Sequence, residues 1–126
     1  MTVFTEPRWA GEFILSEEND GAGSRETITV VAGAGVIAPG SVLGKITASG
    51  KYQLSPDTGA DGSQVASVIA INGCDATTAD KQIVALVRFA QVNGNGLTYH
   101  STVSDDTKKT AKQTQLAASP NFIITR

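Results

Sequence analysis

Few residues in this chain have the type and spacing that catalytic or metal chemistry requires. His100 and Cys74 are the only histidine and the only cysteine among 126 residues. A Ser-His-Asp arrangement or a histidine-rich metal site would therefore depend on His100. A nucleophilic thiol needs a nearby base or positive field, and the sequence neighbours of Cys74 provide neither. We expect a surface or loop histidine and a small, buried or half-buried cysteine.

The carboxylates lie mainly in segments that predict turns. Glu17, Glu18 and Asp20 fall in a Gly-rich joint, whereas catalysis by paired acids needs a rigid frame that fixes their separation. Asp57 and Asp61 resemble the start of a calcium loop, but the intervening acidic ligands are missing. We therefore predict no catalytic residue, no metal site and no cofactor.

A glycine-rich segment at residues 33–38 matches the relaxed dinucleotide-binding pattern G-x-G-x-x-G/A. That pattern holds a pyrophosphate only where a helix begins. Pro39 and Gly40 follow at once and favour a turn. We interpret the segment as a turn between two strands.

Charge and hydropathy exclude several classes of protein. Ten Lys and Arg residues oppose twelve Asp and Glu residues, which gives a net charge of −2, so the basic footprint of a nucleic-acid-binding protein is missing. No apolar run approaches the roughly 20 residues that span a bilayer. We expect neither a nucleic-acid partner nor a membrane partner, and a single cysteine cannot form an intramolecular disulfide.

Short β-branched and apolar runs, separated by Gly, Pro and Asn turns, predict that strands dominate the body. The longest run, residues 82–92, predicts one strand with Ile83, Ala85, Val87 and Phe89 on one face. The other expected strands cover residues 27–31, 36–38, 41–47, 51–54, 65–71 and 121–126.

One helix is predicted near the C-terminus. Ser104 is its expected N-cap, and Asp105 and Asp106 lie where the helix dipole favours negative charge. Asp105 and Lys109 form an i,i+4 pair of opposite charge, and Pro120 ends the segment. The predicted fold is mainly β: a small β-barrel-like or β-sandwich domain with this one short helix and an extended N-terminal arm.

Residues 1–26 predict an arm and a flexible joint ahead of a β-rich body at residues 27–126. Large aromatic side chains, Phe4, Trp9 and Phe13, lie in the arm, and Ile14 and Leu15 follow in an expected extended stretch. Aromatic side chains outside a core often anchor an interface. Two alternatives stay open: these side chains bind a partner, or they fold back onto the body.

Several motifs, in their order along the chain, are similar to those of one family. They are GEFILSE at residues 11–17, SRETITV at 24–30, PGSVLGKI at 39–46, GKY at 50–52, CDAT at 74–77, VRFAQVN at 87–93 and IITR at 123–126. The chain resembles the lambda-type bacteriophage head decoration proteins, which are also called capsid-stabilising proteins.

The resemblance implies a homotrimer in the virion, bound to the outer surface of an expanded capsid through its major capsid protein. It also implies an arm that is mobile in the free protein and adds a strand to a sheet of the shell. The capsid-binding residues would then be Phe4, Trp9, Phe13, Ile14 and Leu15. No enzymatic activity is implied.

Two other functions remain as alternatives. One is a phage tail or fibre accessory module that binds carbohydrate or another virion protein; such modules usually present aromatic platforms on a rigid body. The other is a small trimeric β-enzyme with a site built across subunits around Asp57, Asp61, Asp75 or His100.

Overall fold

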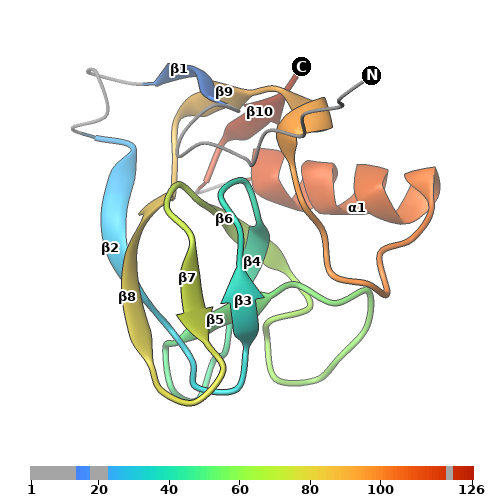
Figure 1. Ribbon diagram of the computed structural model, residues 1–126. Coiled ribbons are helices and arrows are strands. Elements are labelled where there is room, and N and C mark those ends of the chain that lie inside the picture. Colours follow the sequence, from blue (N-terminus) through green and yellow to red (C-terminus); the bar gives the residue numbers. More distant parts are fainter. Residues whose placement is uncertain (1–13, 18–22, 119–120) are drawn as a thin grey trace, which may run out of the picture.

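A closed β-barrel, a three-stranded sheet and one helix form the body in the computed structural model (Figure 1). The structure describes residues 14–17, 23–118 and 121–126. Five strands close the barrel in the order β2-β5-β4-β6-β8. Their bounds are β2 Arg25–Val30, β4 Val42–Lys45, β5 Tyr52–Leu54, β6 Ala66–Ala70 and β8 Lys81–Leu86.

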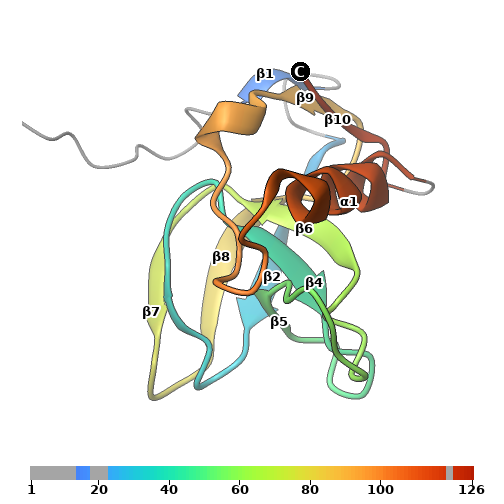
Figure 2. The ribbon, with the colours of Figure 1, turned by 90° about the vertical axis from the view of Figure 1, so that its right-hand side faces the viewer.

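Two further sheets and a helix complete the fold. The three-stranded sheet has the order β1-β9-β10, and β3 pairs with β7 in a two-stranded sheet. Figure 2 shows the three-stranded sheet at one end of the molecule, with the helix α1 beneath it and the barrel below. The bounds are β1 Ile14–Glu17, β3 Gly35–Ile37, β7 Cys74–Ala76, β9 Ala90–Val92, β10 Ile123–Thr125 and α1 Asp106–Ala117.

Strand β2 illustrates why these residues form a barrel. Its β-branched residues suit a pleated surface that is buried on one side, and it pairs with β8 along its whole length, from Arg25 opposite Leu86 to Val30 opposite Lys81. Ile28 and Val30 are buried in the barrel, whereas Thr27 is exposed. The mainly β prediction with one helix near the C-terminus is confirmed, and the barrel is the form it takes.

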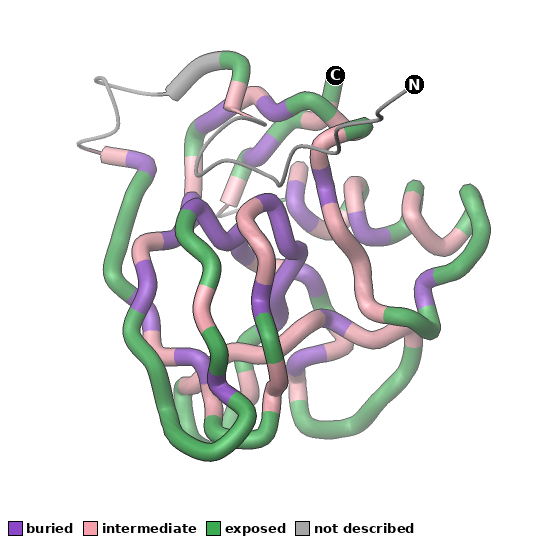
Figure 3. The backbone as a smooth tube through the Cα atoms, viewed as in Figure 1, coloured by how far each residue is buried: buried purple, intermediate pink, exposed green. Residues whose placement is uncertain are grey.

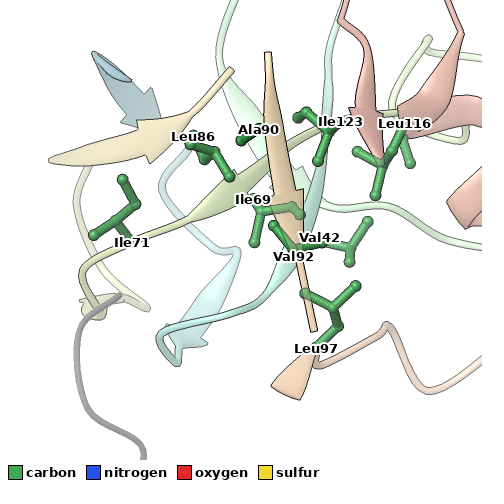
Figure 4. Close-up of a cluster of buried hydrophobic side chains, with 10 residues drawn as sticks. Val42, Ile69, Ile71, Leu86, Ala90, Val92, Leu97, Leu116 and Ile123 are labelled. Carbon is green, nitrogen blue, oxygen red and sulfur yellow. The ribbon is translucent and has the colours of Figure 1, made fainter. Parts of the chain in front are cut away.

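The core consists of two clusters of aliphatic side chains. No aromatic side chain in the described residues counts among the buried hydrophobic ones, which agrees with the few aromatic residues of the chain. Figure 3 shows the buried segments running through the barrel and the three-stranded sheet. In Figure 4, side chains from the barrel, the three-stranded sheet and α1 converge in one cluster. Its members are Val42, Ala66, Ile69, Ile71, Leu86, Ala90, Val92, Leu97, Leu116 and Ile123.

The predicted single strand at residues 82–92 is wrong: the segment forms two strands in different sheets. β8 belongs to the barrel and β9 to the three-stranded sheet. Between them, the chain bends at Phe89, whose φ is +52°. The bend breaks the alternation, so that Ile83, Ala85 and Val87 are buried while Phe89 is exposed.

The helix begins differently from the prediction. Asp105, not Ser104, is the N-cap, and its Oδ1 accepts a hydrogen bond of 2.8 Å from the Lys108 amide. The Asp105 carboxylate is therefore used by the backbone, and the Lys109 ammonium lies over the Tyr99 ring instead. Strand β7 was not among the predicted strands, because three residues after a turn give little periodicity.

Lys112 is a buried cation that ties a loop to the helix. Its side chain is 2% exposed, and Nζ donates to Ser55 Oγ at 3.0 Å, to the Pro56 carbonyl at 2.6 Å and to the Gln64 carbonyl. Burial lowers the pKa of Lys112, and the negative charge of Asp57 opposes that shift. Three hydrogen bonds thus hold the loop after β5 against α1.

We expect Lys112→Ala to lower the free energy of unfolding by about 2 to 4 kcal/mol, because it strands buried acceptors and removes a packed side chain. Lys112→Met keeps the aliphatic stem, so its loss should be smaller. The control is Lys108→Ala, which removes a half-exposed ion pair to Asp57 at 3.6 Å and should cost under about 0.5 kcal/mol. Urea denaturation measures the free energy of unfolding of all three variants. Equal losses for Lys112→Ala and Lys108→Ala would contradict the stabilising role of the Lys112 hydrogen bonds.

Candidate docking face

The outer face of the three-stranded sheet carries apolar side chains that lie outside the core. Ile14 packs against the core cluster of Figure 4, and Ile123 is fully buried. Their neighbours point the other way: Leu15 is 55% exposed and Ile124 is 36% exposed. Because successive side chains of a strand alternate between faces, β10 contributes Ile124 to the outer face. Leu15 is exposed at an irregularity of β1, where the pairing with β9 shifts between Ile14 and Ser16.

Two phenylalanines form a stacked pair at one end of this sheet. The rings of Phe89 and Phe122 are 5.9 Å apart between centroids, with an interplanar angle of 7°. Each side chain is 44% exposed. Phe89 directly precedes β9 and Phe122 directly precedes β10. We call Leu15, Phe89, Phe122 and Ile124 the docking face.

The pairing of β9 and β10 explains why the two rings meet. The strands are parallel, with Ala90 opposite Ile123, so the residues before them also lie side by side. The Phe89 amide donates to the Asn121 carbonyl at 2.9 Å. Arg88, the preceding residue, donates to the Gly23 carbonyl at 2.8 Å and forms an ion pair with Glu26 at 2.5 Å. The entry to β9 is thereby fixed to the start of β2.

Both phenylalanines adopt a backbone conformation that side chains disfavour. φ is +52° at Phe89 and +50° at Phe122, and for a residue with a Cβ atom this region costs about 1 to 2 kcal/mol. Strained residues of this kind concentrate at functional sites. The pair is thus a strained, stacked and half-exposed apolar surface, and exposed apolar surface of this kind is a candidate for contact with a partner.

The other exposed apolar side chains do not belong to this face. Val36, at 73% exposure, lies on β3 in the two-stranded sheet. Polar side chains next to the docking face bond to each other: Arg126 Nε donates to the Gln91 side chain at 3.2 Å. Gln91 lies opposite Ile124 on the neighbouring strand.

The predicted arm residues divide between described and undescribed parts of the chain. Phe4, Trp9, Phe13 and residues 18–22 of the predicted joint lie outside the described residues. Ile14 and Leu15 lie in β1, which pairs with β9 of the same chain. Their binding role and the boundary after residue 26 stay predictions. Leu15 is exposed in the same three-stranded sheet as Ile124, with β9 between their two strands.

Sequence reasoning missed three members of the docking face: Phe89, Phe122 and Ile124. Ile124 follows from the alternation within β10, once Ile123 is known to be buried. The phenylalanine pair had no such signal, because a positive φ is expected of Gly and Asn, and only rarely of Phe.

The carboxylates proposed for the enzyme alternative are used in local structure. Asp61 accepts from the Ser63 amide and hydroxyl at 3.0 and 2.6 Å, and these bonds lower the pKa of Asp61. The Thr77 hydroxyl and amide lower the pKa of Asp75 in the same way. Asp57 pairs with Lys108. Within residues 14–17, 23–118 and 121–126, no group of three or more His, Cys, Asp or Glu side chains is placed to hold a metal ion.

The other sequence candidates also have structural positions. Burial and the charge of Asp75 raise the pKa of the Cys74 thiol, which lies in β7, and a raised pKa disfavours the nucleophilic thiolate. His100 Nδ1 lies 2.9 Å from the Thr102 hydroxyl. The glycine-rich segment is a turn only at its start: residues 32–34 turn between β2 and β3, and Gly35–Ile37 form β3 itself. φ is positive at Gly33 and Gly35.

Comparison with known proteins gives one family. Residues 3–121 match the model of the family described as Bacteriophage lambda head decoration protein D. A comparison with curated protein sequences gave no match. Among the helices of the described residues, none has both the length and the apolar character to cross a membrane.

The backbone strain at Phe89 predicts an unusual order of stability. Phe89→Ala loses the aromatic stack and keeps the strained φ, whereas Phe89→Gly loses the same stack and relieves the strain. We expect the glycine variant to be more stable than the alanine variant by about 1 kcal/mol in urea denaturation. Ile124 in β10 provides the control, because alanine should be the more stable there. The same order at both positions would contradict the argument.

Proposed function

We propose that this member of the bacteriophage lambda head decoration protein D family binds the outer surface of the expanded capsid as a homotrimer and stabilises the shell. Because the chain belongs to that family, it is a structural component of the phage virion that associates with the capsid. The observation that carries this proposal beyond the family is the docking face. It combines an exposed aromatic stack, strained backbone and two further apolar side chains on one sheet.

The position of β1 connects the docking face to the N-terminal arm. β1 is an edge strand of the three-stranded sheet, and the arm directly precedes it in the sequence. Phe4, Trp9 and Phe13 would then contact the capsid beside Leu15. Extended segments bind well to exposed sheet edges, where main-chain hydrogen bonds give affinity and side-chain pockets give specificity. The arm adds a strand to the shell in this way.

Stabilisation of the shell follows from mass action. A protein that binds only the expanded shell stabilises it by RT ln(1 + [L]/Kd) for each site, which is about 2.7 kcal/mol at a hundredfold excess over Kd. Three arms and three docking faces on one trimer act together, so modest individual contacts give high avidity.

One observation favours a second candidate function, carbohydrate binding as a virion accessory module. The stacked Phe89 and Phe122 rings form an aromatic platform on the rigid body, and such platforms are typical of glycan-binding modules. Titration of the protein with a glycan library, monitored by chemical shifts of the two rings, tests this function. The enzyme alternative has no comparable support, because Asp57, Asp61 and Asp75 are used in ion pairs and turns.

Charge placed on the docking face should separate capsid binding from folding. We expect Leu15→Asp with Ile124→Asp to weaken binding to expanded capsids about a hundredfold or more, because anchors at a desolvated interface are worth about 2 kcal/mol each. The melting temperature should change little, since both side chains are exposed. Co-sedimentation with expanded capsids and a thermal melt measure the two effects.

Val36→Asp is the matched control, because Val36 is also exposed and apolar but lies on β3. It should bind capsids like the unmodified protein. If Val36→Asp weakens attachment as much as the double variant, the docking face is assigned to the wrong surface.

A further inference from the structure

A polar pocket lies where the barrel closes through a single pair of residues. β2 pairs with β8 along its whole length, but with β5 only where Val30 lies opposite Tyr52. The pocket has a volume of about 340 Å³, and all five barrel strands or the residues next to them line it. The lining includes Glu26 of β2, Lys45 of β4, Tyr52 of β5, Ser67 and Val68 of β6, and Val87, which directly follows β8.

The pocket adjoins the phenylalanine pair of the docking face. Arg88 and Asn121 also line the pocket, and they directly precede Phe89 and Phe122 in the sequence. The Phe89 amide donates to the Asn121 carbonyl at 2.9 Å, so the two segments are joined at this point. A partner that covers the stacked rings therefore lies next to the pocket.

Three polar groups of the lining have no partner among the described residues. Ser67 Oγ is buried and makes no hydrogen bond there, and burial of an unpaired hydroxyl costs free energy. The Lys45 ammonium and the Tyr52 hydroxyl form no ion pair or hydrogen bond within residues 14–17, 23–118 and 121–126. All three groups can donate a hydrogen bond, so the pocket offers free donors to a ligand.

The pocket also carries one uncompensated positive charge. Arg88 pairs with Glu26 at 2.5 Å, which leaves the charge of the exposed Lys45 side chain without a counter-ion in the lining. Burial and the negative charge of Glu26 raise the pKa of Tyr52. The phenol of Tyr52 therefore stays protonated at neutral pH and is able to donate.

We propose that this pocket binds an acidic side chain of the phage shell, an inference that rests on the proposed function. A carboxylate would accept hydrogen bonds from the Lys45 ammonium and from the Ser67 and Tyr52 hydroxyls. The methylene groups of the same side chain would pack on Val68 and Val87, which are buried apolar residues of the lining. One carboxylate also balances the one free positive charge.

A phosphate group fits this pocket less well than a carboxylate. A phosphate ester carries up to about two negative charges at neutral pH, whereas the pocket has one positive charge to spare. The Glu26 carboxylate in the lining would repel the second negative charge. Charge complementarity therefore favours a glutamate or aspartate side chain as the occupant.

Two matched tripeptides test the pocket in the free protein. The probe is acetyl-Leu-Glu-Leu-amide, and its control is acetyl-Leu-Gln-Leu-amide, which has the same shape without the charge. The glutamate peptide should shift the NMR resonances of the Tyr52 ring and saturate in the millimolar range, because one side chain in a pocket gives modest affinity. The glutamine peptide should bind about tenfold more weakly. Absence of a saturable shift, or equal affinity for the two peptides, would overturn the proposal.

Lys45→Gln and Lys81→Gln form a matched pair of variants for the location. Both lysines are exposed and each variant removes one positive charge, but Lys81 does not line the pocket. Lys45→Gln should weaken binding of the glutamate peptide about tenfold, and Lys81→Gln should leave it unchanged. Equal effects of the two variants would overturn the proposal.

Ser67→Ala separates binding from stability. It removes a buried hydroxyl without a partner, so the melting temperature should stay the same or rise, while the affinity for the glutamate peptide falls. A lower melting temperature with unchanged affinity would contradict a role of Ser67 in the pocket.

Expanded capsids test the shell as the source of the acidic side chain. Lys45→Gln should weaken co-sedimentation with capsids about tenfold, and Lys81→Gln should attach like the unmodified protein. Normal attachment of Lys45→Gln would overturn this inference and leave the proposed function intact. Failure of the unmodified protein to attach would overturn the proposed function, and with it the shell as the partner of this pocket.

Discussion

The pairing of β9 with β1 on one side and β10 on the other is the interaction on which the proposed functional surfaces depend. It joins a segment near the start of the chain, a segment from its middle and its last described residues into one sheet. Without β1, Leu15 has no fixed place beside the body. Without the parallel register of β10, Phe122 does not stack on Phe89. The docking face consists of residues that lie in this sheet or directly precede its strands.

The barrel provides the rigidity that this sheet needs. Leu86, Val92, Ile123 and Leu116 share one cluster, so the barrel, the sheet and α1 are packed on common side chains (Figure 4). Lys112 adds a polar link by donating to three acceptors in the loop after β5. The core is aliphatic throughout the described residues. Tyr52 and Tyr99 pack partly buried against this core, and Phe89 and Phe122 are the exposed aromatic side chains of the described residues.

Much of the fold followed from local patterns, and the candidate site did not. The β-branched run at residues 27–31 predicted β2, and the acidic start and proline stop predicted α1 to within two residues at its beginning. The break between β8 and β9 depends on a positive φ at Phe89, which tertiary packing imposes against local preference. The burial of Lys112 was missed for a similar reason, because its acceptors come from residues far away in the sequence. Leu15 was identified from the sequence, but its neighbours on the docking face required the sheet register.

A reconstruction of expanded capsids decorated with this protein is the most direct measurement of the central claim. The account predicts trimers at three-fold and quasi-three-fold positions, with Leu15, Phe89, Phe122 and Ile124 in contact with the shell and the N-terminal arm continuing onto it. The account would be contradicted by density in which the three-stranded sheet points away from the shell and the opposite end of the barrel contacts it.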